Sequence, residues 1–303
     1  MVGGKGVAFP APMRNSTGLY VILAADAGSR GGAASSRIHS ACEVTIDELV
    51  AVHPDLMSRR VRAVFNPKTE TVASWEETCF VDLVIDEKPA SSPDPEAPAR
   101  VLATAAAERF ASVFTPDDAA MQLLDKIRFA ARIFPEKHLP DVSDAGLIAR
   151  LPALCFGLQR LEAVRRIDWR HVISTELDYP VRTWLDTAFP DRISVPSGSL
   201  ISVNYKDAAK PDGAPHMACR IQELFGLLET PRIAEGRVPV VLHLLAPNMR
   251  PCQVTTDLKS FWQNTYKDVR KDLKGRYPKH YWPENPYEAA ATSRVRGPRD
   301  RTR

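Results

Sequence analysis

A proline-rich segment, EKPASSPDPEAP at residues 87–98, interrupts the chain and limits what it can fold into. It contains four prolines, two serines and no large apolar side chain, so it has little to bury and is typical of a linker or exposed loop. Short β-rich runs precede it, and helical periodicity follows it directly. We therefore expect an α+β fold of two parts, because 303 residues exceed one average domain.

The part before this segment is predicted to be a small β domain, residues 1–88. Its β-rich runs are residues 18–28, 35–44 and 58–85, with NPKTE (66–70) as a hairpin turn. A short helix over 45–53 interrupts them, with Thr45 as its N-cap and Glu48 completing a capping box. This pattern predicts a small barrel or sandwich, for which an OB-like barrel is one form.

The part after a linker at 89–98 is predicted to be mixed, with helices first and strands later. The helical subdomain, residues 99–190, is expected to contain the helices 98–114, 116–134, 143–158 and 169–189. An α/β subdomain, residues 191–292, is expected to follow, with strands in 191–205, 216–221 and 237–247 and a last helix starting near Asp257. The basic tail 293–303 is predicted to be disordered.

Positive charge gathers at the C-terminal end. Residues 250–303 hold thirteen Lys or Arg against six Asp or Glu, a net charge of +7, whereas the rest of the chain carries −4. In the last helix, the apolar residues fall on one face and the lysines elsewhere, and GRYPKH (275–280) follows it. This asymmetry favours an anionic partner. The alternative is a solvated helix end, with Gly275 as cap and Pro278 preventing the helix from restarting.

Motifs for catalysis, metals and membranes are missing from the sequence. The glycine-rich VGGKG (2–6) does not fit a Walker A loop, and no DExH/D motif is present, so these residues are not expected to hydrolyse ATP. No GxSxG or HExxH occurs. A thiol–imidazole pair between His243 and Cys219 or Cys252 is conceivable, but His243 lies in an apolar strand and is typical of a core residue. We expect no catalytic residue, metal or cofactor.

The five cysteines are scattered without a CxxC pair, which predicts reduced thiols in a cytoplasmic protein. No apolar run approaches the roughly 18 residues of a membrane helix, and the start does not resemble a secretory signal. The sequence thus predicts no membrane association.

Residues 220–286 carry the pieces QELFGL, TPRI, GRVPV, HLLAP and GRYPKH in an order and spacing that resembles the C-terminal domain of the bacterial HrpB family of ATP-dependent DEAH-box helicases. ISVPSGSLISVNY (193–205) and MVGGKGVAF (1–9) are also similar to that family. Two departures stand out: Tyr281 occupies a position where the family usually has proline, and the two RecA-like motor domains have no counterpart in these residues.

The resemblance implies an accessory, RNA-binding region, with ATP and magnesium bound only by motor domains. These would lie either in a longer chain of which these residues are a part or in a separate chain. Such a region needs cations for phosphates and aromatic rings for bases. The candidate nucleic-acid-binding residues are Arg232, Arg237, Arg250, Lys267, Arg270, Lys271, Lys274, Arg276, Tyr277, Lys279 and His280. Each is alternatively a structural residue, for example an ion-pair partner.

Two other functions compete with this one. The first is a protein-interaction module, in which the Trp/Tyr face of the last helix and QELFGL (222–227) dock on a helicase or another partner. The second is an unrelated hydrolase with its site at the domain junction.

Overall fold

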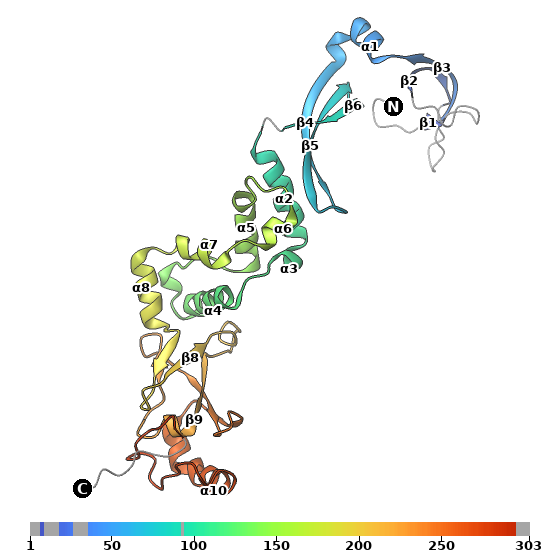
Figure 1. Ribbon diagram of the computed structural model, residues 1–303. Coiled ribbons are helices and arrows are strands. Elements are labelled where there is room, and N and C mark those ends of the chain that lie inside the picture. The colour runs from blue at the N-terminus through green and yellow to red at the C-terminus, as the bar shows by residue number, and fades with distance from the viewer. Residues whose placement is uncertain (1–6, 9–17, 27–35, 92–93, 295–303) are drawn as a thin grey trace. The chain divides into compact units, whose positions relative to one another are not determined.

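The computed structural model describes residues 7–8, 18–26, 36–91 and 94–294 (Figure 1). The chain forms two compact units, each built from two segments. Unit 1 consists of residues 1–115 and 148–167, and unit 2 of residues 116–147 and 168–303. The glycine-rich stretch 2–6 and all but two residues of the predicted tail 293–303 lie outside the described residues.

Unit 1 begins with strands in two separate sheets. One sheet has the order β1-β3-β2, with β1 parallel and β2 antiparallel to β3; the other is the antiparallel meander β4-β5-β6. The strands are β1 (Val7–Ala8), β2 (Leu19–Ala25), β3 (Ser36–Val44), β4 (Met57–Asn66), β5 (Thr71–Phe80) and β6 (Leu83–Pro89). In the described part of unit 1 no ladder joins the two sheets, so the OB-like closed barrel stays a prediction.

The local signals in this region are confirmed. The predicted turn at 66–70 joins β4 to β5, and the Asn66 side-chain oxygen accepts hydrogen bonds from the Lys68 and Thr69 amides. The expected capping box opens α1 (Ile46–Val52): the Thr45 hydroxyl accepts from the Glu48 amide at 3.2 Å, and the Glu48 carboxylate accepts from the Thr45 amide at 2.8 Å. A 3-10 turn (Pro54–Leu56) leads into β4.

Helices complete unit 1 and occupy part of the predicted linker. The helices are α2 (Glu96–Glu108), α3 (Phe110–Val113), α6 (Leu161–Arg165) and part of α5 (Asp144–Leu154). α2 starts at Glu96 and not at Pro98, and the Asp94 carboxylate accepts a hydrogen bond from the Glu96 amide at this start. Since α2 packs on β4 and β5, contacts group it with the strands, whereas the predicted domains placed it with the helices of 99–190.

The tip of the β4–β5 hairpin is fixed to α6. The Arg165 guanidinium donates to both carboxylate oxygens of Glu70, at 2.7 and 3.1 Å. The Leu161 amide also donates to the Glu70 carbonyl, and the Val72 amide to the Gln159 carbonyl. These bonds give unit 1 a rigid connection between segments that lie far apart in the sequence.

Unit 2 combines helices with a mixed sheet, which confirms the α+β class. The helices are α4 (Asp118–Ile133), α7 (Trp169–Glu176) and α8 (Tyr179–Ala188), with 3-10 turns at Pro135–Lys137 and Ile221–Glu223. The sheet order is β13-β12-β9-β8-β7, antiparallel except for the parallel β9–β12 pair. Its strands are β7 (Arg192–Ser194), β8 (Leu200–Asn204), β9 (His216–Arg220), β12 (Val241–Leu245) and β13 (Pro251–Thr255).

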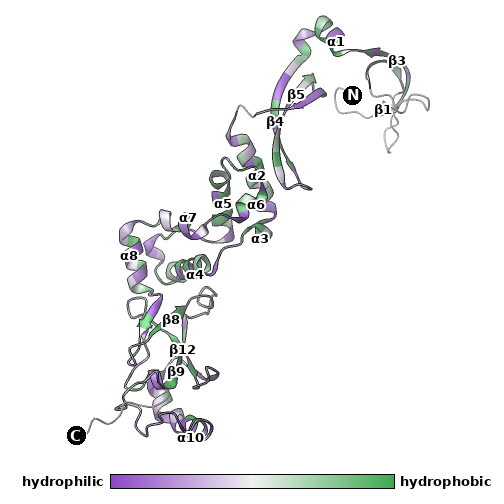
Figure 2. Cartoon of the chain, in the orientation of Figure 1, coloured by the Kyte–Doolittle hydropathy of each residue, from purple (hydrophilic) through white to green (hydrophobic). Residues whose placement is uncertain are grey.

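One face of this sheet supplies the core of unit 2. A two-stranded ribbon and a terminal helix complete the unit. Val203, Met217, Leu242 and Leu244 are at most 1% exposed. A two-stranded ribbon, β10 (Arg232–Ile233) and β11 (Val238–Pro239), stands apart from the main sheet. The chain then forms a terminal helix of three parts: α9 (Leu258–Ser260), a π-helical turn (Phe261–Thr265) and α10 (Tyr266–Arg276). In Figure 2, α10 is largely hydrophilic.

Candidate nucleic-acid interface

The terminal helix begins where the sequence predicts. The Asp257 carboxylate accepts a hydrogen bond from the Ser260 amide at 2.9 Å and caps the first turn. The π-helical turn follows at once, and both Phe261 and Trp262 are buried there although they are consecutive. A π turn inserts an extra residue into the helix, which lets its apolar face shift around the axis.

The apolar face of this helix is fixed inside unit 2. The Trp262 indole N–H donates to the Leu227 carbonyl at 2.9 Å, and the Tyr266 hydroxyl donates to the Pro283 carbonyl at 3.0 Å. The Phe225 ring contacts Trp262, Tyr266 and Tyr281, each with centroids 5.9 Å apart. Tyr281, the departure from the family's usual proline, therefore has a packing role.

These contacts overturn the interaction-module interpretation in the form that the sequence suggested. Gln222, Glu223, Leu224 and Phe225 of QELFGL are at most 5% exposed, and Trp262 is 4% exposed. Residues that fill the core of their own unit are not available to a partner, so QELFGL and the Trp/Tyr face cannot be the docking surface.

The opposite side of α10 carries a row of free lysines. Lys267, Lys271 and Lys274 are spaced at i, i+4 and i+7, which places them on one face of the helix. All three are exposed, and within the described residues none of them has an ion-pair partner. We call these three residues the lysine row.

The neighbouring arginines of the helix differ from the lysine row. The Arg270 side chain is 20% exposed, donates to the Trp282 carbonyl at 3.1 Å and pairs with Glu284 at 3.0 Å. Arg270 thus holds the following loop against the helix, and its prediction as a phosphate contact is not supported by its surroundings. Arg276 pairs with Asp272 at 2.8 Å, but both side chains are exposed, so this pair is weak and easily exchanged.

The corner at GRYPKH is ordered by hydrogen bonds. α10 continues through Gly275 to Arg276, so Gly275 is not the cap; the Tyr277 amide bonds the Leu273 carbonyl at the helix end. The Tyr277 carbonyl accepts from the Trp282 indole and from the His280 amide. The Tyr277 and His280 rings meet edge to face at 6.0 Å, and both are half-buried. Lys279 is exposed beside them.

His280 lies close to a further cation. Burial lowers the pKa of the His280 imidazole, and the positive charge of Arg220 at the end of β9 lowers it further.

The three outlying arginines are not part of this cluster of contacts. Arg232 donates to the carbonyls of Gly236 and Arg237 and so closes the β10–β11 turn. Arg237 lies over the Phe134 ring, 4.1 Å from its centroid. Arg250 is exposed; its amide donates to the Asn248 side chain, and its guanidinium has no partner among the described residues. Two of the three thus have structural roles.

The conceivable thiol–imidazole pair between Cys219 and His243 does not form. Cys219 and His243 lie on opposite faces of the sheet, since Cys219 points into the core and His243 pairs on the outward face. Burial raises the pKa of the Cys219 thiol to about 12, which keeps it protonated near neutral pH. Within the described residues no cluster of His, Cys, Asp or Glu has a metal-binding arrangement, and no helix is long and apolar enough to cross a membrane.

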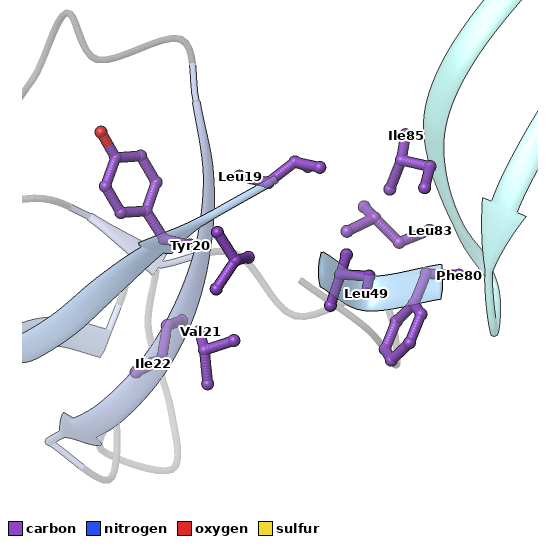
Figure 3. A pocket seen from close by; sticks show the side chains of 9 residues that line it. Leu19, Tyr20, Val21, Ile22, Leu49, Phe80, Leu83 and Ile85 are labelled. Carbon is purple, nitrogen blue, oxygen red and sulfur yellow. The ribbon is translucent and has the colours of Figure 1, made fainter. Parts of the chain in front are cut away.

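An apolar pocket of about 310 Å³ lies within unit 1 (Figure 3). Side chains of β2 line one side, and Leu49, Phe80, Leu83 and Ile85 line the other. Tyr20 contributes the one side-chain hydroxyl of this lining. Such a lining suits an apolar contact and offers no acid, base or nucleophile for catalysis.

The outward face of the main sheet was not singled out by sequence reasoning. His216 and His243 stack there with ring centroids 4.6 Å apart and an angle of 13° between their planes. His243 is only partly buried, so it is not the core residue that the sequence indicated. The alternation in HMACR (216–220) and VLHLL (241–245) was the available signal, because it places both histidines on one face.

Comparison with known proteins decides the family. Residues 151–286 match the family described as "ATP-dependent helicase C-terminal" (HrpB_C). The chain is 34% identical over 265 residues to the ATP-dependent RNA helicase HrpB of Escherichia coli, which covers 86% of this chain and 32% of that protein. The chain is a C-terminal HrpB-family region.

Two solved HrpB structures agree with this assignment. The crystal structure of the E. coli DExH-box NTPase HrpB matches with a TM-score of 0.64 and 33% identity, covering 91% of this chain and 34% of that one. The crystal structure of the E. coli DEAH/RHA helicase HrpB matches with a TM-score of 0.55 and 29% identity, covering 87% and 32%. The chain thus spans about a third of the length of the HrpB proteins that it matches.

Proposed function

We propose that this chain is an accessory region of an HrpB-type RNA helicase and that it binds single-stranded RNA through the lysine row, with Arg276 and Lys279 beside it. The observation that carries the proposal is that Lys267, Lys271 and Lys274 share one exposed helix face without carboxylate partners among the described residues. Unpaired lysines on a rigid helix suit the regularly spaced phosphates of a nucleic acid.

In this proposal the chain supplies affinity and not the chemical step. ATP and magnesium would act in motor domains such as those of the family, on the same polypeptide or a separate one, and the assembly would work in the cytoplasm. The relative named an ATP-dependent RNA helicase is about three times as long as the matched region, which leaves room for such domains.

The test measures the affinity of the purified chain for a fluorescein-labelled single-stranded RNA 20-mer across a salt series. The triple variant Lys267→Ala, Lys271→Ala, Lys274→Ala should lower the magnitude of the slope of log affinity against log salt by about 2, since each single-strand phosphate contact contributes about 0.7. A matched variant, Lys68→Ala, Lys88→Ala, Arg166→Ala, removes the same charge from unit 1 and should leave the slope unchanged. Equal slopes for wild type and lysine-row variant would refute the proposal.

A second candidate function, docking on a helicase motor or another protein, is favoured by one observation in unit 1. Val21, which lines the Figure 3 pocket, is 43% exposed, and Leu23 of the same strand is 67% exposed. The test is co-elution of this chain with the part of the E. coli relative outside the matched region, supplied as a separate protein. Leu83→Asp should abolish co-elution. If the wild-type chain does not co-elute with that part of the relative, this function is excluded.

A further inference from the structure

The main sheet of unit 2 has an open face opposite its core face. Backbone alternation and register place Arg192, Ser202, Asn204, His216, Ala218, Arg220, His243 and Val254 on this side. Ser202, Asn204 and Ala218 are exposed, and Leu200 and Val254 are 61% and 54% exposed. The exposed part of this face therefore runs over Arg192, Ser202, Asn204, Ala218 and Val254, whereas His216, Arg220 and His243 are partly covered.

The strands of this face carry positively charged side chains but no negatively charged ones. None of the strands β7, β8, β9, β12 and β13 contains Asp or Glu, whereas the open face presents Arg192 and Arg220. Two carboxylates approach it from outside the strands: Asp207 lies 3.9 Å from the His216 ring, and Glu223 is buried and accepts a hydrogen bond from Arg220. The strands of the face are therefore free of negative charge, and Asp207 is the carboxylate that approaches its centre.

Two stacked imidazoles occupy this centre. His216 and His243 come from the neighbouring parallel strands β9 and β12. Their rings are stacked and nearly parallel, with an angle of 13° between the ring planes. Burial lowers the pKa of His216, and His243 lowers it further, which favours a neutral ring that stacks without charge repulsion. Hydroxyl and amide groups of Ser202 and Asn204 lie on the same face.

We propose that this open sheet face is a second binding surface, on which bases of single-stranded nucleic acid stack while Arg192 and Arg220 contact phosphates. Flat π surfaces with neighbouring polar groups suit unpaired bases, and a surface without carboxylates on its strands suits the phosphate backbone. The proposal rests on the proposed function of the lysine row.

The experiment places a carboxylate at the centre of the face. Ala218→Glu should weaken binding of the labelled RNA 20-mer by about tenfold or more, because a negative charge would meet the phosphates. Ala149→Glu, at an exposed position of α5, is the matched control and should change the affinity less than about twofold.

The stacking role is tested separately with an RNA that carries 2-aminopurine at its centre. His243→Ala should weaken binding by about fivefold or more, as expected for loss of one base–ring stack, with an unchanged salt slope and less quenching of 2-aminopurine. His243→Phe keeps a flat ring and should restore both affinity and quenching. Thermal melts establish that each variant is folded.

The outcomes separate this proposal from the proposed function. If folded Ala218→Glu and His243→Ala bind like the wild type while the lysine-row variant is weakened, the sheet face is not a binding surface and the proposed function stands. If the wild type binds no single-stranded RNA, both proposals fail.

Discussion

Arg270 and Lys271 are neighbours in the chain and carry the same charge, yet their surroundings assign them different roles. Arg270 is turned toward the loop that follows the helix and bonds the Trp282 carbonyl and Glu284. Lys271 is exposed, without an ion-pair partner in the described chain. A sequence shows the charge of a residue, but only the fold shows whether that charge is already paired.

This contrast gives a prediction for stability. Arg270→Ala should lower the free energy of unfolding by about 1–3 kcal/mol, because the buried Trp282 carbonyl loses a donor. Lys271→Ala should change it by less than about 0.5 kcal/mol. Urea unfolding of both variants measures the difference, and equal losses would contradict the roles described for them.

His216 makes stability depend on pH. Its pKa is lowered in the folded chain, so the unfolded chain binds a proton more readily as the pH falls below the ordinary value of 6.5. The stability is therefore fully present above that value and decreases as the solution becomes more acidic. Melting temperatures measured between pH 7.5 and pH 5 should fall, and His216→Phe should reduce the fall. An identical pH profile in that variant would exclude His216 as the cause.

At the scale of elements, the terminal helix joins a buried aromatic face to an exposed cationic one. Trp262 is one of its anchors, since it is 4% exposed and its indole N–H donates to the Leu227 carbonyl. Trp262→Ala should cost about 3–5 kcal/mol of unfolding free energy through the cavity that it leaves. Trp262→Phe should cost less, because it keeps a ring and loses the hydrogen bond. A small effect of Trp262→Ala would show that the helix is held mainly by other contacts.

Sequence periodicity predicted most elements but not their details. The last helix and its start near Asp257 were predicted because apolar residues recur at three- and four-residue steps. The π turn was not, because Phe261 and Trp262 fit an ordinary helix in a sequence pattern. The alternation in β9 and β12 predicted strands but not which face would be left open, since that depends on which neighbours pack against the sheet.

The sequence predicted only the part of the candidate site that depends on local spacing. The lysine row follows from helical spacing alone, whereas the pairing of Arg270 with Glu284 joins residues beyond one helix. Likewise, Arg237 lies over the distant Phe134 ring, a contact that no local pattern indicates. Tertiary contacts decide which cations are free.

At the scale of the whole molecule, the segment between β6 and α2 is the expected point of first cleavage. The described residues between Pro89 and Glu96, which are Ala90, Ser91, Asp94 and Pro95, lie outside helices and strands, and Asp94 and Pro95 are exposed. Limited proteolysis with a non-specific protease should cut there or beyond residue 292 before it cuts elsewhere. Mass spectrometry of the first fragments identifies the site. An early dominant cut within 220–280 would contradict the compactness of unit 2.

The segments of the two compact units alternate along the sequence, and the boundary between residues 147 and 148 falls inside α5. Synthesis on the ribosome proceeds from the N-terminus at about 5–20 residues per second, and domains tend to fold as they emerge. Unit 1 cannot follow that simple order, because α4 emerges before α6 does. The tip of the β4–β5 hairpin therefore waits for Arg165 to leave the exit tunnel before Glu70 gains its partner. A nascent chain arrested before residue 148 would display that hairpin without its anchor.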